Sequence, residues 1–427
     1  MKLNVFWFRR DLRLFDNTAL IEALKQGNPV LCLFFFDEKI LKELPADDAR
    51  VTFIHKQLEK INQELAKHKS SLLVRHGEPE KIWSELIEEY NIEAVYSNKD
   101  YEPYARRRDG AIRDLLKDQN IEFHRFKDQV IFEEKEVLKD DGDPYTVYTP
   151  YKNKWLSQFK KKDFPVQELP KKPNFHEFEV DFPSLKDIGF EKSEIEVRDY
   201  DLSDLDQYDS VRNFPAKDAT SYLSPHLRFG TVSIRDIIAK LGKEEQKFMN
   251  ELIWREFFMQ ILYNYPSVAK NNFRSKYDGI QWRNNEDDFR KWCKGETGYA
   301  MVDAGMRELN ATGYMHNRVR MVVASFLCKH LLIDWKWGEA YFAEKLLDYE
   351  LSSNNGNWQW AAGTGCDAAP YFRIFNPMTQ IDKFDKQHKY IKKWVPEFGT
   401  EKYVKPMVDH KEARELALDA YKQGIES

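Results

Sequence analysis

Residues 251–263 place acidic, basic and aromatic side chains on one helical face, where they could bind a planar ligand. The segment reads ELIWREFFMQILY, and helical spacing brings Glu251, Trp254, Arg255 and Phe258 to the same side. The carboxylate and the guanidinium could hydrogen-bond a ligand on which the indole stacks. A surface Glu–Arg pair beside a core tryptophan is the alternative, and the segment alone favours that simpler interpretation.

A second segment, residues 313–321, offers two arginines that could hold an anion or reach a DNA phosphate. It reads GYMHNRVRM, in which Asn317 and Met321 share a helical face while Arg318 and Arg320 point to different sides. A solvated basic face explains the same spacing equally well.

A third segment, residues 348–365, holds two tryptophans among amides, serines and glycines. On a helix, Trp358 and Trp360 lie on roughly opposite faces, so one can face a cofactor while the other meets a second ligand. Asn, Ser and Gly are poor residues for a helix interior, which indicates backbone and amide groups close to a ligand. A helix–turn junction with two core tryptophans explains the same residues equally well.

A fourth segment, residues 218–230, carries hydroxyl groups that could hold a diphosphate at a helix start. Ser224 before Pro225 fits a helix N-cap followed by proline, and Thr220 and Ser221 lie just upstream. Ordinary helix caps have the same composition, so this segment alone does not identify a ligand site.

The elements that must position these residues differ between the two ends of the chain. Short apolar runs alternate with helical patterns over residues 1–130, which predicts an α/β domain with a Rossmann-like parallel sheet covered on both faces. Residues 131–206 are rich in proline and charge and predict an interdomain linker, whereas residues 207–427 predict an all-α domain. The expected strands are 3–8, 30–36, 72–74 and 94–96, and the expected helices between them are 50–67, 79–90 and 102–118.

The composition is that of a globular protein with two domains. The 427 residues carry a formal net charge of −5, so nucleic acid would have to bind a local basic patch. The four cysteines show no CxxC spacing, which predicts reduced thiols and no metal site. No apolar run has the length of a membrane span, and we expect a soluble cytoplasmic protein.

Together, the four segments resemble the photolyase/cryptochrome family. The motif FWFRRDLRLFDN at residues 6–17 and DAAPYFRIFNP at 367–377 extend the resemblance over essentially the whole chain, most densely over 208–380. The resemblance implies an antenna-type domain over 1–130 and an FAD- and lesion-binding domain over 207–427. It is closest to the class I photolyases that repair cyclobutane pyrimidine dimers.

The resemblance implies that FAD binds in the helical domain. Asn354 would face flavin N5, where an amide can donate or accept in several redox states. Tyr208, Thr220, Ser221 and Ser224 would hold the diphosphate, and Arg255, Asn317, Arg320, Asp348 and Glu350 would line the flavin, with Arg320 and Asp348 as an ion pair.

The resemblance also implies electron transfer and lesion binding. Trp358, Trp335 and Trp282 match the family's tryptophan chain, which reduces the flavin from the surface in light. Reduced flavin would pass an electron to a dimer flipped out of UV-damaged DNA and split its cyclobutane ring. Trp254 and Trp360 would flank the dimer, Glu251 would hydrogen-bond it, Met321 would pack beside it, and Arg212, Arg318 and Arg373 would approach the DNA backbone.

Several positions bear on the branch of the family. Three positions favour a dimer photolyase. Asn354 stands where plant cryptochromes carry Asp, Met321 stands where (6-4) photolyases carry His, and Trp360 is retained. Phe248 and Tyr314 stand where Trp is common, which predicts altered packing. The antenna would be methenyltetrahydrofolate or 8-hydroxy-5-deazaflavin, or its site would be empty. Residues 102–105, EPYA, are closer to the deazaflavin pattern.

Two other functions compete with repair by what we expect to be a monomer. A cryptochrome-like photoreceptor would share the tryptophan chain but need not bind lesions, and Glu251, Trp254, Met321 and Trp360 together argue against it. A nucleic-acid-binding scaffold with a vestigial flavin pocket would not need the full set of residues from Thr220 to Trp360.

Overall fold

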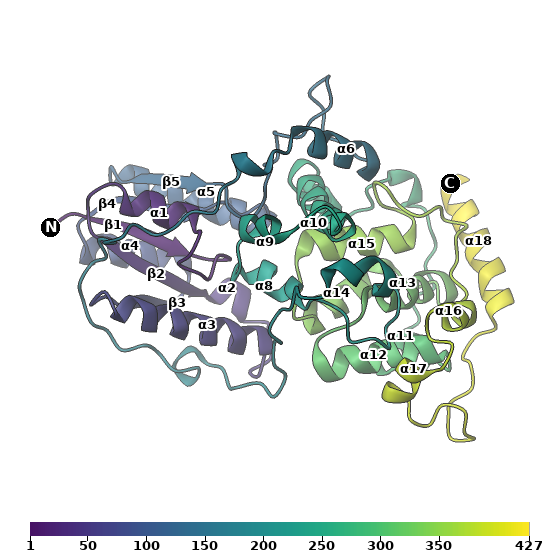
Figure 1. Cartoon of the computed structure of the whole chain (residues 1–427). Helices are drawn as coiled ribbons and strands as arrows, with labels where there is room; N and C mark the ends of the chain where they lie inside the picture. Colours follow the sequence, from purple (N-terminus) through teal and green to yellow (C-terminus); the bar gives the residue numbers. More distant parts are fainter. Residues whose placement is uncertain (427) are drawn as a thin grey trace. The chain divides into compact units, whose positions relative to one another are not determined.

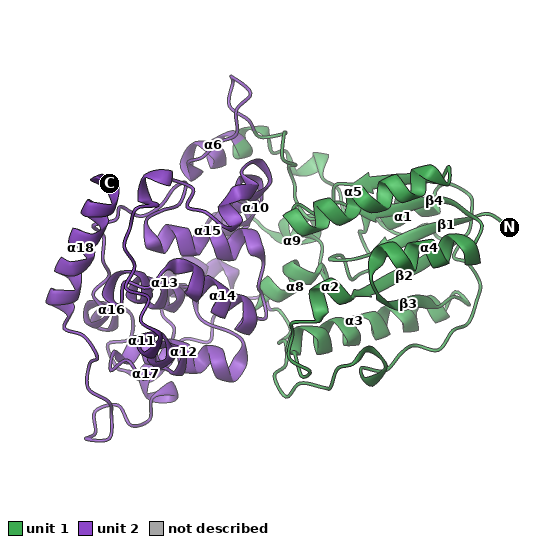
Figure 2. Ribbon diagram, turned by 180° about the vertical axis from the view of Figure 1, so that it is seen from behind, with its two compact units in different colours: residues 1–137, 155–200, 222–243 green, residues 138–154, 201–221, 244–427 purple. Residues whose placement is uncertain are grey.

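The computed structural model describes residues 1–426, which form two compact units (Figure 2). Unit 1 comprises Met1–Val137, Trp155–Tyr200 and Tyr222–Lys243. Unit 2 comprises Leu138–Lys154, Asp201–Ser221 and the residues from Glu244 onward. The chain therefore alternates between the units, and the domain boundaries at 130 and 206 stay a prediction.

Unit 1 confirms the predicted α/β fold with a parallel sheet. Its five strands pair in the order β3-β2-β1-β4-β5, and every pairing is parallel (Figure 1). All residues of the central strand β1 and of its neighbour β2 are buried, as expected for a sheet covered on both faces. The strands are β1 (Leu3–Phe8), β2 (Val30–Asp37), β3 (Leu72–Gly77), β4 (Ile92–Asn98) and β5 (Glu122–Phe126).

Two apolar layers cover the sheet of unit 1. One face packs against α1 and α3 and against the extended segment around Phe175 and Phe190, and the other packs against α4 and α5. These helices have the 3.6-residue apolar spacing from which most of them were predicted. Unit 1 contains α1 (Thr18–Leu24), α2 (Glu38–Leu41), α3 (Ala49–Ala66), α4 (Pro79–Glu89), α5 (Pro103–Asp118), α8 (Leu223–Phe229) and α9 (Ile234–Lys240).

A buried charge network explains much of the N-terminal motif at residues 6–17. Asp128 accepts from Arg13 Nη2 at 2.6 Å and from Arg235 Nη2 at 2.8 Å. Arg235 Nε also donates to Asp16 at 3.0 Å, which joins the loop after β1 to α9. Burial alone would raise the pKa of Asp128, but the two guanidinium groups hold it below its usual value. These charged residues therefore have a structural role within unit 1.

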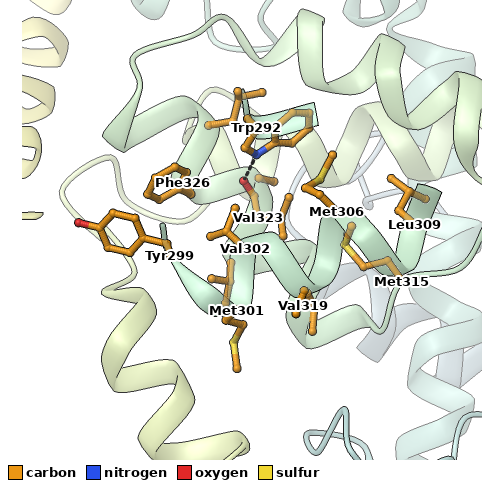
Figure 3. Close-up of a cluster of buried hydrophobic side chains, with 14 of the residues drawn as sticks. Trp292, Tyr299, Met301, Val302, Met306, Leu309, Met315, Val319, Val323 and Phe326 are labelled. Carbon is orange, nitrogen blue, oxygen red and sulfur yellow. Dashed lines mark hydrogen bonds between the residues drawn. The ribbon is translucent and has the colours of Figure 1, made fainter. Parts of the chain in front are cut away.

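Unit 2 is helical, as predicted, and its core forms where α12 packs against α13 (Figure 3). The two helices approach closely at Gly305, where an added Cβ would lie 2.4 Å from Val319. The indole Nε1 of Trp292 donates to the carbonyl of Val323 at 3.3 Å, so this core tryptophan is fixed in place. The long helices are α10 (Gln246–Asn264), α11 (Glu286–Lys294), α12 (Ala300–Thr312), α13 (Asn317–Ser325), α14 (Trp335–Lys345), α15 (Leu351–Ala362), α16 (Pro377–Phe384) and α18 (His410–Glu426).

Shorter elements complete the helical part. The predicted linker contains α6 (Tyr148–Gln158), whose first residues belong to unit 2. A π-helical turn, Phe326–His330, continues α13 toward α14. The remaining short helices of unit 2 are α7 (Tyr208–Val211) and α17 (Lys389–Trp394). Within residues 1–426, no helix combines the length and the apolar composition needed to cross a bilayer.

Candidate active site

Three helices of unit 2 carry most of the predicted site residues. Helix α15 packs against α10, α13 and α14, which brings the segments that hold these residues to one place. Two glycines permit the approach, because a Cβ on Gly356 would lie 2.2 Å from Phe258 and one on Gly338 would lie 2.1 Å from Trp358. Helix α10 carries Glu251, Trp254 and Arg255, α13 carries Asn317, Arg318, Arg320 and Met321, and α15 carries Asn354, Trp358 and Trp360.

The predicted ion pair between Arg320 and Asp348 is present and bidentate. Arg320 Nη1 donates to Asp348 Oδ1 at 3.2 Å and Nη2 donates to Oδ2 at 2.9 Å. Its Nε donates to the carbonyl of Met315 at 2.8 Å, so the guanidinium plane is fixed. Arg255 and Glu350 form a second, looser pair at 3.5 Å. The carboxylates of both pairs lie just before α15, and the arginines come from within α10 and α13, so charged groups of both signs are available to a polar ligand there.

The amide of Asn354 is oriented by Glu339, a residue that no sequence motif singled out. Asn354 Nδ2 donates to both the carbonyl of Glu339, at 3.0 Å, and its carboxylate Oε1, at 2.9 Å. Burial raises the pKa of the Glu339 carboxyl, and the hydrogen bond from Asn354 opposes that rise. Because both amide hydrogens are engaged, Oδ1 is the atom that Asn354 can offer to a ligand. If Asn354 contacts a flavin, these bonds favour a role for its side chain as hydrogen-bond acceptor and not as donor.

This arrangement predicts the effect of Glu339→Leu, which removes the carboxylate that accepts from the Asn354 amide and keeps the backbone carbonyl. Losing one oriented hydrogen bond should shift the reduction midpoint potential of bound flavin downward by on the order of 30–60 mV. Spectroelectrochemical titration of the purified holoprotein would measure the shift. Asn357→Ala is the control, because Asn357 is exposed on the same helix and its amide donates to the Ser353 carbonyl. Equal potentials in both variants would show that Glu339 does not orient the amide.

Two of the three tryptophans of the predicted electron-transfer chain are buried, and the third reaches the surface. Trp358 and Trp335 are buried, and Trp282 is partly exposed. Trp335 Nε1 donates to Asn272 Oδ1 at 2.8 Å, and Trp282 meets the ring of Tyr421 edge-on at 5.8 Å. In the described part of the chain, the closest ring neighbours of Trp358 are Phe342 at 4.9 Å and Trp292 at 6.2 Å, rather than Trp335.

The residues predicted to meet a lesion are partly accessible and already have protein partners. Trp254 is half-buried, and the ring of Tyr148 stacks on it at 3.6 Å. Glu251 Oε1 accepts from Arg212 at 2.6 Å, which joins a predicted lesion residue to a predicted DNA contact. Trp360 is half-buried and stacks on Phe375 at 6.5 Å.

Of the three arginines predicted to contact DNA, Arg318 lies within the electrostatic influence of the other two. Burial lowers the pKa of Arg318, and the nearby charges of Arg212 and Arg373 lower it further. Arg318 also donates to Asn213 at 2.6 Å and lies over the ring of Phe384 at 4.4 Å. The lowered pKa of Arg318 indicates a positive potential at this side chain, which suits a phosphate on an otherwise acidic protein.

The residues predicted to hold a diphosphate are divided between the units. Thr220 and Ser221 end a stretch of unit 2, whereas Ser224 lies in α8 of unit 1. The predicted N-cap at Ser224 is wrong, because α8 begins at Leu223 after Tyr222, whose φ is +50°. Tyr208 packs edge-on against Phe248 at 5.3 Å, one of the two positions where Trp was expected in the family. The diphosphate role of this group stays a prediction.

Unit 1 contains a cavity of about 510 Å³ that no sequence pattern predicted. Phe15, Lys60, His68 and Glu168 are among its lining residues, and Arg13 of the charge network forms part of its wall. Residues 102–105, on which the antenna prediction depended, are not among those that line it.

Comparisons with known proteins agree along the whole chain. A family described as "DNA photolyase" matches residues 4–173, and one described as "FAD binding domain of DNA photolyase" matches residues 248–400. The deoxyribodipyrimidine photo-lyase of Vibrio cholerae is 36% identical, over 98% of this chain and 99% of its own. A class III photolyase from Agrobacterium tumefaciens superposes with a TM-score of 0.90 at 33% identity, covering 100% of this chain and 98% of its own. An archaeal photolyase from Sulfolobus tokodaii, solved with two FAD molecules, has a TM-score of 0.85 at 36% identity, covering 98% and 99%.

Proposed function

Because this chain belongs to the DNA photolyase family of light-driven, FAD-binding repair enzymes, we propose that its lesion is the cyclobutane pyrimidine dimer. The observation that carries this proposal is the position of two side chains on α10. The indole of Trp254 and the carboxylate of Glu251 are three residues apart and share a face of this helix. An indole can stack on a flipped base, and a carboxylate can accept hydrogen bonds from its N–H groups. Met321, without a titratable group, stands where a (6-4) photolyase would carry histidine.

The residues around α15 fit FAD by their chemistry. Arg320 and Asp348 form a fixed ion pair, Arg255 and Glu350 a second, and Asn354 presents an oriented amide oxygen. Few structural needs would place so many polar groups around one helix, whereas an isoalloxazine has donors and acceptors along its edges. When bound, FAD supplies light absorption and one-electron transfer.

The protein's own residues then position and stabilise the reactants. Asn354 Oδ1 accepts a hydrogen bond from an N–H of the ligand, and Glu339 prevents the amide from turning. Glu251 is held by Arg212, so its second oxygen is directed for bonding to a base while the guanidinium remains close to the DNA backbone. Arg318 and Arg373 add positive charge for phosphate, so affinity for DNA should fall as salt rises.

The tryptophan chain serves a separate purpose, the recovery of reduced cofactor from oxidised cofactor. Trp358, Trp335 and Trp282 each can lose an electron, and the last is accessible at the surface of unit 2. Protein reduced by chemical means should therefore repair DNA without this chain.

The proposal predicts light-dependent repair that requires Trp254. Protein reduced in advance would be mixed with an oligonucleotide containing one thymine dimer, and restored thymine absorbance followed in light and in the dark. Trp254→Ala should weaken dimer binding by roughly 5- to 150-fold, because stacking on one base is worth about 1–3 kcal/mol. Trp337→Phe, at another partly exposed indole of unit 2, is the control.

The same assay distinguishes the alternatives. Flavin that is photoreduced normally while the dimer stays intact would refute dimer repair and favour a cryptochrome-like photoreceptor. Repair of a (6-4) photoproduct instead would assign a different lesion to the same fold.

We further propose a second, light-harvesting chromophore and a monomeric, cytoplasmic enzyme acting on UV-damaged DNA. The archaeal relative's two FAD molecules are described as implying a novel light-harvesting cofactor, which adds FAD to methenyltetrahydrofolate and 8-hydroxy-5-deazaflavin as candidates. Mass spectrometry of the chromophores released from purified protein would identify it, and sedimentation would give the oligomeric state.

A further inference from the structure

Tyr148 covers one face of the tryptophan that we expect to meet the lesion. Its ring lies parallel to the indole of Trp254, with centroids 3.6 Å apart and planes 8° from each other. Phe257 meets the same indole edge-on at 5.6 Å, and Phe258 stacks on it with an offset at 5.4 Å. Trp254 is therefore held between rings, although it remains only half-buried.

Tyr148 is itself anchored at both ends. Its hydroxyl donates to the carbonyl of Asn250 on α10 at 2.8 Å, one helical turn before Trp254. Its backbone N–H lies in the first turn of α6 and therefore has no acceptor within the helix. It donates instead to the carboxylate of Asp367 at 3.0 Å. Burial raises the pKa of the Tyr148 phenol and the charge of Glu251 raises it further, so the hydroxyl stays protonated and donates at any physiological pH.

The Asp367 anchor connects the two tryptophans predicted to flank the lesion. Asp367 lies in the loop after α15, which leads on to Arg373 and Phe375, and Arg373 lies over the Phe375 ring at 5.5 Å. Phe375 in turn stacks on Trp360. A continuous set of contacts within unit 2 thus runs from Trp254 through Tyr148 and this loop to Trp360.

We infer that Tyr148 is a positioning residue that fixes the plane of Trp254 for lesion recognition. The inference rests on the proposed function and adds a residue to it. The hydroxyl hydrogen bond holds the ring and the backbone hydrogen bond holds the start of α6, so the ring acts as a backing for the indole and not as a gate. Turning the ring away would break the bond to Asn250 and the stacking on Trp254. The ligand it serves is a pair of adjacent pyrimidine bases turned out of a DNA strand, which would meet the part of the half-buried indole that remains exposed.

The test measures dark binding, which does not depend on catalysis. The dissociation constants of the FAD-loaded protein for a dimer-containing duplex and for the matched undamaged duplex give a discrimination ratio. Tyr148→Leu removes the flat ring and should reduce this ratio by roughly 2- to 10-fold, the range expected for one aromatic pair. Affinity for undamaged DNA and the flavin absorption spectrum should not change.

Matched variants separate positioning from general packing. Tyr148→Phe keeps the stacked ring and should restore most of the ratio, and Tyr145→Leu, at a tyrosine of the same segment that contacts Tyr151, should leave it unchanged. If Tyr148→Leu loses FAD or unfolds, Asp367→Asn, which weakens the anchor but keeps the ring, should lower the ratio in the same direction.

Two results would overturn the inference while leaving dimer repair intact. One is an unchanged ratio in Tyr148→Leu and in Asp367→Asn. The other is tighter dimer binding by Tyr148→Leu, which would make Tyr148 an obstacle to the lesion. If the wild-type protein itself does not discriminate the dimer from undamaged DNA, the proposed function fails instead.

Discussion

Asp128→Ala should lower the free energy of unfolding of unit 1 by about 3–5 kcal/mol, because the change leaves two buried guanidinium groups without their shared carboxylate. The side chain of Asp128 is 1% exposed, and those of Arg13 and Arg235 are 8% exposed. Solvent cannot replace the lost charge at this depth. Denaturant unfolding, followed by a probe in unit 1 such as Trp83 fluorescence, would measure the difference.

Asp114→Ala is the matched control for this effect. Asp114 pairs with Arg113 on the surface of the same unit, where an ion pair contributes at most about 1 kcal/mol. The pKa of Asp128 is lower in the folded than in the unfolded state, so its contribution is complete above the unfolded pKa of about 3.9 and is lost as pH falls through the folded pKa. The difference in free energy of unfolding between the two variants should therefore shrink as the pH falls into the acid range. Equal stability of the two variants at neutral pH would show that the network is not stabilising.

Trp358→Phe should abolish most photoreduction of oxidised flavin by an external donor. Phenylalanine fills nearly the same buried space but gives up an electron much less readily, so the rate should fall roughly tenfold or more, at least ~1.4 kcal/mol in barrier height. Illumination in the presence of a thiol, with the loss of oxidised flavin absorbance recorded, would measure it. Dimer repair by chemically reduced protein should be unaffected.

Trp292→Phe tests whether the electron follows the predicted chain. Trp292 is also fully buried, and its ring centroid is 6.2 Å from that of Trp358. If the route runs through Trp335 and Trp282, Trp292→Phe photoreduces normally. If Trp292→Phe loses most of its photoreduction rate and Trp335→Phe loses none, the electron passes through Trp292 on α11 and not through Trp335.

The sheet could be predicted from the sequence where strands are buried and not where one is exposed. Strands β1 to β4 follow apolar runs, but β5 reads EFHRF and has no fully buried residue. Both β3 and β5 are edge strands, but β3 begins with a buried Leu-Leu pair that marks it as a strand, whereas the polar composition of β5 resembles that of a loop. Helix α6 was missed for a related reason, because Pro150 and neighbouring polar residues gave the region the composition of a linker.

The site could be predicted only as far as local spacing reaches. Residues three and four apart on α10 were grouped correctly because helical geometry sets that spacing. The partners that orient them come from distant segments, as Tyr148 does for Trp254 and Arg212 does for Glu251. No pattern along the chain specifies such tertiary contacts. Local spacing could have indicated Glu339, because it lies one helical turn after Trp335 on α14.

The order of the chain through the two units has a consequence for biosynthesis. Asp16 and Arg235, which bond within unit 1, are 219 residues apart, and unit 2 segments intervene. At a translation rate of about 5–20 residues per second, roughly 10–45 s separates the synthesis of the two partners. During that interval Asp16 lacks its arginine partner, and Asp128 has only Arg13 of its two guanidinium partners. Completion of the α/β unit on the ribosome therefore waits for α9, and a pause or truncation before residue 235 should leave a protease-sensitive intermediate.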